Sequence, residues 1–200
     1  MITSANRDEA NQLFYELLGL EEDSHLDFKS AFNFDKDEFV KDVVSFYNGV
    51  GATFESLSHP GRRAGYMLLG VLDNAGQKTL TPLKQHVDPA VFEPLLRART
   101  SPCVEVHYHI VDGDGIGNYA LLEIVKGSVG PAVDPADHGG FPRNHSSYTT
   151  EDIPCCARVW YRKRTSKDTV KTLLELDEVS KQFDVQFDGM YKTGIAISPG

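Results

Sequence analysis

Hydrophobic residues recur at helical spacing in four parts of the chain, namely 7–20, 35–48, 88–99 and 166–182. In the second of these, Asp35 stands where an N-cap is expected, and Phe39, Val43 and Phe46 lie on one apolar stripe. Asn48 and the glycine after it end that stripe. The pattern predicts a helix in each of the four segments.

Short apolar runs bounded by turn residues predict six strands, at 26–30, 52–57, 66–72, 104–111, 119–125 and 157–162. A polar loop at 59–63 joins the second strand to the third, and a glycine-rich turn at 112–118 joins the fourth to the fifth. Residues 129–154, rich in Pro, Gly, His and Ser, predict a long loop. Consecutive hairpins mixed with helices favour an α+β fold with a mixed or antiparallel sheet and flanking helices.

The length of 200 residues suits one main domain. We expect an N-terminal helix in 1–20, the domain in 21–182 and a C-terminal strand or tail in 183–200. Three cysteines cannot form a paired disulfide framework, which favours a reducing compartment. There is no apolar run near eighteen residues and no charged-then-apolar leader, so the expected location is the cytoplasm, without membrane attachment.

The formal net charge of −9 argues against a protein that coats DNA nonspecifically, because such proteins are normally basic. The charge is distributed unevenly, with acids concentrated in 8–9, 21–23, 35–38 and 134–137 and bases in 158–171. A local basic region can still attract a polyanion, so nucleic acid remains a candidate partner.

Four segments in order resemble the Schlafen/AlbA-like family of nucleic-acid-binding domains. They are Glu22 with Asp27-Phe28-Lys29, then Ser45-Phe46-Tyr47-Asn48-Gly49, then Leu68-Leu69-Gly70-Val71-Leu72-Asp73, and Tyr161-Arg162-Lys163-Arg164-Thr165-Ser166. The resemblance covers about 22–170. The chain departs from the family pattern at Asp27, where Glu is usual, at Leu72, which replaces an acid, and at Arg164, which replaces a turn glycine.

The resemblance implies a catalytic and metal-binding triad of Glu22, Asp27 and Asp73, because Schlafen ribonucleases hold a metal with three carboxylates. Oxygen ligands suit Mg²⁺ or Mn²⁺. The alternative is that the first two acids are surface residues and that Asp73 belongs to an ordinary turn.

Cationic and aromatic residues supply the expected phosphate contacts. They are Lys29, Arg62, Arg63, Tyr161, Arg162, Lys163, Arg164 and Lys167. Three consecutive bases, 162–164, end a predicted strand before a predicted helix, a position that favours phosphate. The alternative is a solvated strand end whose bases offset an acidic surface.

Two histidines, His107 and His109, fall on the same face of a predicted strand and could bind a metal. More often such residues are half-buried sheet positions, and no Cys or His stands at zinc spacing from them.

Together these features predict a divalent-metal-dependent endoribonuclease-like domain acting on structured RNA such as tRNA, with DNA as the other nucleic acid considered. One alternative is a non-catalytic nucleic-acid- or nucleotide-binding module of a regulatory or defence protein. A third is an interaction domain that forms a homodimer through its exposed sheet.

Overall fold

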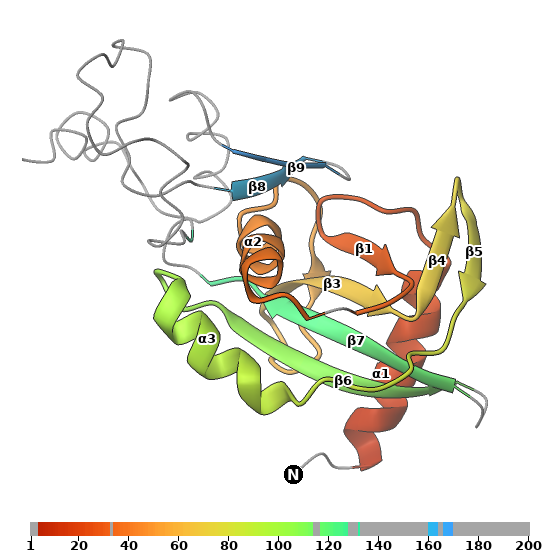
Figure 1. The fold of residues 1–200 in the computed structure, drawn as a ribbon. Helices are drawn as coiled ribbons and strands as arrows, with labels where there is room; N and C mark the ends of the chain where they lie inside the picture. The colour runs from red at the N-terminus through yellow and green to blue at the C-terminus, as the bar shows by residue number, and fades with distance from the viewer. Residues whose placement is uncertain are drawn as a thin grey trace, which may run out of the picture.

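A mixed five-stranded sheet forms the centre of the protein (Figure 1). The computed structural model describes residues 4–32, 34–113, 117–127, 132, 160–163 and 166–169. The strand order is β1 (Leu26–Lys29), β3 (Arg63–Leu69), β7 (Gly117–Val125) and β6 (Glu105–Gly113), with β2 (Phe54–Glu55) paired to the start of β3. Only β1 pairs in parallel with its neighbour in this sheet. The predicted α+β class is therefore confirmed.

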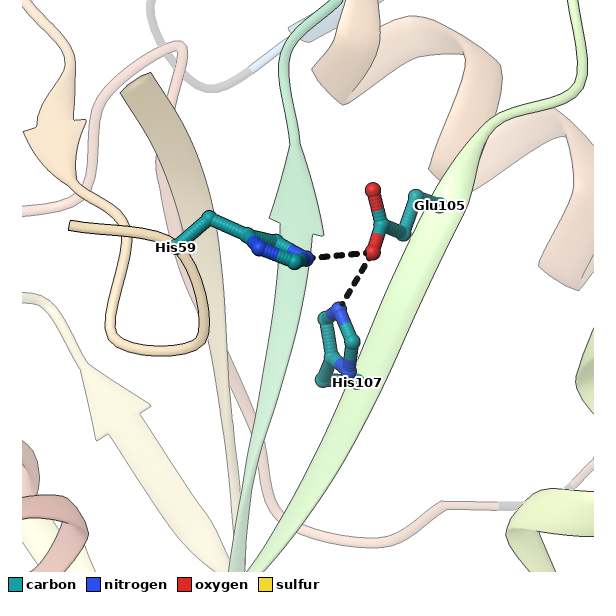
Figure 2. Close-up of side chains that lie close together, drawn as sticks. All are labelled: His59, Glu105 and His107. Carbon is teal, nitrogen blue, oxygen red and sulfur yellow. Dashed lines mark hydrogen bonds and ion pairs between the residues drawn. The ribbon is translucent and has the colours of Figure 1, made fainter. Parts of the chain in front are cut away.

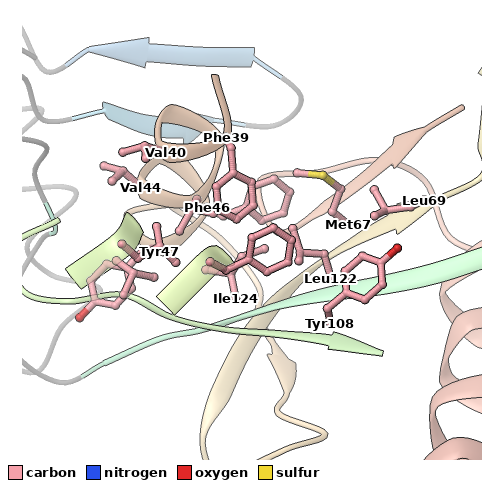
Figure 3. Packing of buried hydrophobic residues seen from close by; sticks show 14 of the residues in the cluster. Phe39, Val40, Val44, Phe46, Tyr47, Met67, Leu69, Tyr108, Leu122 and Ile124 are labelled. Carbon is pink, nitrogen blue, oxygen red and sulfur yellow. The ribbon is translucent and has the colours of Figure 1, made fainter. Parts of the chain in front are cut away.

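Helices cover both faces of the sheet because its central strands are apolar on both sides. In β3, Met67 and Leu69 pack on one face against α2 (Lys36–Tyr47) and α3 (Phe92–Arg99), which follows a 3₁₀ turn η1 (Pro89–Val91) (Figure 3). The alternate residues Tyr66 and Leu68 pack on the other face with α1 (Ser4–Leu18). This period of two follows from strand geometry and divides the core into two clusters.

Helix α2 begins and ends where its sequence predicts. The Asp35 side chain accepts hydrogen bonds from the backbone N–H groups of Asp37 and Glu38, at 3.0 and 2.9 Å. Its apolar residues are buried against the sheet, and Asn48 follows as the C-cap. The helix predicted at 88–99 is also present, with Asp88 capping η1 through the N–H of Ala90. In the described ranges, no helix is both long enough and apolar enough to cross a bilayer.

The strand predicted at 66–72 is divided at Gly70, which corrects the sequence reading. Gly70 has φ of 92°, and a Cβ there would lie 2.7 Å from the Tyr119 ring. The chain turns at this point into a separate hairpin, β4 (Val71–Asn74) and β5 (Gln77–Leu80). The sequence did not predict β5, because its residues are polar and lack a clear alternation.

The helix predicted at 166–182 is wrong at its start. Residues there form β9 (Ser166–Thr169), which pairs antiparallel with β8 (Trp160–Lys163), and both strands contact α2. Tertiary pairing outweighs weak local propensity in such short polar segments. Residues 170–182, most of the predicted 129–154 loop and the predicted tail at 183–200 lie outside the described residues.

Candidate functional site

A pocket of about 520 Å³ lies where the edge of β1 meets the β4–β5 hairpin. Three acids predicted from the sequence, Glu22, Asp27 and Asp73, line it, together with Lys29. The apolar part of the lining includes Phe28 and Val71. Segments about fifty residues apart in the chain therefore bring the acids and one base to a single concave surface, which we call the acid pocket.

Glu22 reaches the pocket because the chain before β1 folds back on itself. The backbone N–H of Asp23 donates to the carbonyl of Leu26 at 3.1 Å, which closes a tight turn. Glu22 Oε1 then accepts the N–H of Phe28 at 2.8 Å. The carboxylate is thus fixed beside an edge strand, in place of a neighbouring strand's carbonyl.

Asp27 and Lys29 form an ion pair on one side of β1. Lys29 Nζ lies 2.8 Å from Asp27 Oδ2, and the side chains are 37% and 8% exposed respectively. A nearly buried carboxylate requires a nearby positive charge, since its desolvation is costly. Lys29 supplies that charge while remaining accessible to a ligand in the pocket.

Asp73 belongs both to the pocket and to a turn. Its Oδ1 accepts the N–H of Gly76 at 2.8 Å, and Ala75 and Gly76 both have positive φ, as a tight hairpin turn requires. The alternative interpretation, that Asp73 belongs to a turn, is therefore correct, and the same residue also lines the acid pocket.

Lys78 is a further cation beside this pocket that the sequence reading missed. It stands opposite Asp73 in the β4–β5 register, and its Nζ lies 4.7 Å from the centre of the Phe28 ring. Nζ also donates to the carbonyl of Leu20. Lys78 could have been found only by recognising β5 as a strand.

The oxygen donors of the acid pocket suit a hard divalent cation such as Mg²⁺ or Mn²⁺. The donor atoms of Glu22, Asp27 and Asp73 are not all within 4.8 Å of one another in the described structure. An ion held there by these side chains would therefore use one or two carboxylates directly and reach the rest through water, which is usual for Mg²⁺.

The other predicted phosphate contacts within the described residues lie away from the acid pocket. Arg63 stands at the start of β3, and Leu69 at the other end of that strand pairs with Lys29 of the acid pocket. Arg63 and Leu69 are six positions, or about 20 Å of strand, apart. Arg62 forms an ion pair with Glu105 at 2.9 Å. The predicted contacts Tyr161, Arg162, Lys163 and Lys167 belong to the β8–β9 hairpin beside α2, and Arg164 lies outside the described residues.

A second polar cluster lies where the segment between β2 and β3 meets β6 and β7. His109 Nε2 lies 2.8 Å from Oε2 of the fully buried Glu123, which also accepts the hydroxyls of Ser56 and Ser58 at 2.5 and 2.6 Å. Burial alone would raise the pKa of Glu123, but these hydrogen bonds outweigh it and lower the pKa to about 2. A carboxylate at this position thus stays charged at neutral pH.

Next to it, His59 and His107 both approach one oxygen of Glu105 (Figure 2). Burial acts to raise the pKa of Glu105, yet hydrogen bonds from His59, His107 and Arg62 prevail and lower it. The sequence correctly placed His107 and His109 on one face of a strand. It missed the remaining members, because His59 comes from the loop before β3 and the carboxylates carry no motif.

The fold is an α+β domain with an acid-lined pocket at the edge of its main sheet. The family model of "Schlafen, AlbA_2" matches residues 22–171, which is most of the chain. The chain therefore belongs to the Schlafen/AlbA_2 family. A search of curated proteins finds no significant match.

Proposed function

We propose that this chain binds RNA and cleaves its phosphodiester bonds with the help of Mg²⁺ or Mn²⁺ at the acid pocket. The observation that carries the proposal is the meeting of Glu22, Asp27, Asp73 and Lys29 around one pocket. Membership of the Schlafen/AlbA_2 family supports a role connected with nucleic acid. The use of its cysteines favours action in the cytoplasm.

The proposed division of labour follows from the charges. Glu22, Asp27 and Asp73 would hold the ion, directly or through water, and Lys29 and Lys78 would offset the charge of a phosphate beside it. A divalent ion, when bound, supplies an activated water and stabilises negative charge on the phosphate oxygens. Phe28 and Val71, both buried, supply part of the apolar lining of the pocket.

The β8–β9 hairpin is proposed to extend the contact along the nucleic acid. Its register places Arg162 opposite Lys167, so two basic residues occupy paired positions of the hairpin. Replacing both with Gln should weaken RNA binding about equally for different sequences and reduce the salt dependence of binding by about two charges. The exposed residue Lys84 offers a matched control, and an unchanged salt slope would exclude the hairpin.

Asp27→Asn tests catalysis because it keeps the shape of the side chain and removes its charge. We expect loss of RNA cleavage in Mg²⁺ and Mn²⁺, with RNA affinity retained or raised because carboxylate–phosphate repulsion disappears. The control is Asp8→Asn, which removes an exposed acid on α1, outside the pocket lining. Cleavage that survives Asp27→Asn would overturn the proposed role of the acid pocket.

A non-catalytic binding module is the second candidate, and the Asp27–Lys29 ion pair favours it. In this reading Lys29 already neutralises Asp27, and Asp73 serves the hairpin turn. Wild-type protein that binds RNA and leaves it intact in both metals would establish this alternative. Protein that binds neither RNA nor DNA at low salt would contradict both candidates and leave an interaction domain.

A further inference from the structure

Two histidines converge on a single carboxylate oxygen at the edge of the main sheet. Nε2 of His59 lies 2.5 Å from Glu105 Oε1, and Nε2 of His107 lies 2.9 Å from the same atom. In Figure 2, Glu105 and His107 project from β6, and His59 reaches them from a loop. One potential donor atom from each residue lies within 4.8 Å of the other two.

The backbone fixes these three residues from two sides. Glu105 and His107 are two apart in β6 and so occupy the same face of the strand. His59 belongs to the loop between β2 and β3, where its N–H donates to Ser56 Oγ at 2.9 Å and its carbonyl accepts the N–H of Arg62 at 3.0 Å. These bonds fix the shape of the loop without involving the histidine ring, and the Arg62–Glu105 ion pair links the loop to β6.

The carboxylate itself is oriented by a separate partner. Arg62 Nη1 lies 2.9 Å from Glu105 Oε2, which directs the other oxygen, Oε1, to the histidines. Carboxylates that bind metals are commonly held in this way by a further hydrogen bond. The side chains of His59, Glu105 and His107 are 39, 39 and 33% exposed, so a solute can reach them.

Two imidazole nitrogens and one carboxylate oxygen form a donor set typical of Zn²⁺ and related ions. Around an ion with bonds of about 2.0–2.1 Å, tetrahedral ligand atoms stand about 3.3 Å apart. The present separations of 2.5 and 2.9 Å from Glu105 Oε1 need only a small outward movement of half-exposed side chains. A bound ion would separate the two ring nitrogens that now approach the same carboxylate oxygen.

We propose that His59, Glu105 and His107 bind one first-row transition-metal ion, with Zn²⁺ the best match. This site is separate from the acid pocket, whose donors are all oxygen, and does not depend on the function proposed for that pocket. Glu105 and His107 also line a groove of about 440 Å³ together with Cys103 and Arg97. The groove leaves room for water or another ligand to complete the coordination of the ion.

The test is metal binding by chelator-treated protein, measured by calorimetry with Zn²⁺ and by the visible absorption of Co²⁺. We expect one tight site whose affinity falls more than about tenfold in His107→Gln and in Glu105→Gln, since even outer partners of a metal site have effects of that size. The tetrahedral Co²⁺ band should weaken in parallel. The cysteines are unchanged in each variant, so the difference isolates the cluster.

Two further variants keep the test decisive. His59→Gln alters only a half-exposed loop side chain, so it should lose the site while the fold, followed by circular dichroism, is preserved. His86→Gln is the matched control, because His86 contacts Tyr108 and lies outside the cluster. Wild-type protein without a Zn²⁺ site, or unchanged affinity in His59→Gln and His107→Gln, would overturn the proposal.

Discussion

Asn48 holds Ala132 through both ends of its side-chain amide. Its Nδ2 donates to the carbonyl of Ala132 at 2.7 Å, and its Oδ1 accepts the N–H of Ala132 at the same distance. Asn48 is completely buried at the C-cap of α2, and the two residues are 84 positions apart in the chain. Asn48, which belongs to the Ser45–Gly49 motif of the family resemblance, therefore links the end of α2 to Ala132, beyond β7.

Asn48→Asp should destabilise the protein by about 2–3 kcal/mol, because a buried carboxylate cannot donate to the Ala132 carbonyl and leaves that carbonyl facing another acceptor. Urea unfolding followed by circular dichroism measures the change. Asn118→Asp makes the same substitution at an exposed position and should have little effect. Equal stability of the two variants would show that the bidentate contact contributes little.

Glu123 should contribute stability that is lost in acid. Its folded-state pKa of about 2 lies below the ordinary value of 4.5, so the folded state favours the charged form. The contribution is complete above about pH 4.5 and disappears as the pH falls towards about 2, with a maximum of about 3 kcal/mol. Urea midpoints across this range should therefore fall more steeply for wild type than for Glu123→Gln.

The exposed residue Glu9 provides the control for this experiment, and Glu9→Gln should retain the acid sensitivity of the wild type. If Glu123→Gln and wild type lose stability in parallel, the hydrogen bonds from Ser56, Ser58 and His109 do not hold the charged form as described.

Lys126 should also make stability rise with pH, but in the range above neutrality. Its Nζ is buried, donates to the carbonyl of Gly49 at 2.8 Å and lies 2.9 Å from His25 Nε2. Burial, aided by the charge of Arg63, lowers the pKa of Lys126 to about 7 from 10.5. Between these values the unfolded chain holds a proton that the folded chain has lost, so stability rises with pH.

From about pH 7 to about pH 9 this rise should approach 2–3 kcal/mol in wild-type protein and be absent in Lys126→Met. Denaturant unfolding at the two pH values measures it, and Lys84→Met is the control at an exposed lysine. A rise of the same size in Lys126→Met would assign the slope to other groups.

The sequence predicted those parts of the fold whose signals are local. Helix α2 carries its own cap at Asp35, and the β6–β7 hairpin has an apolar run on each side of a single turn. The β4–β5 hairpin was missed because the break depends on Gly70, whose conformation is set against Tyr119 from a distant strand.

The same distinction applies to the sites. Glu22 and Asp27 are close in sequence, so their association could be predicted, and the structure places both around one pocket. His59 and Glu105 are 46 residues apart and meet only because the β2–β3 loop folds over β6. No spacing in the sequence encodes that contact. The helix predicted to start at residue 166 was wrong because β9 depends on pairing with β8.

Lys29 offers the sharpest test of whether the acid pocket is a cation site. In the present structure its ammonium lies 2.8 Å from Asp27, where it would compete with a divalent ion for the same carboxylate. Lys29→Gln should therefore tighten Mg²⁺ binding by a few-fold. The gain is limited to under about 1 kcal/mol, because Lys29 is more than a third exposed and solvent screens such pairs.

The same substitution should weaken RNA binding and reduce its salt dependence by about one charge, because a phosphate contact is lost. Calorimetry measures Mg²⁺ binding, and RNA titrations at several salt concentrations measure RNA binding. Mg²⁺ is chosen because it prefers oxygen donors and so favours the acid pocket over the histidine cluster. Lys84→Gln serves as the control for both. Weaker Mg²⁺ binding in Lys29→Gln would mean that Lys29 supports the pocket without competing for it, and unchanged RNA binding would remove Lys29 from the interface.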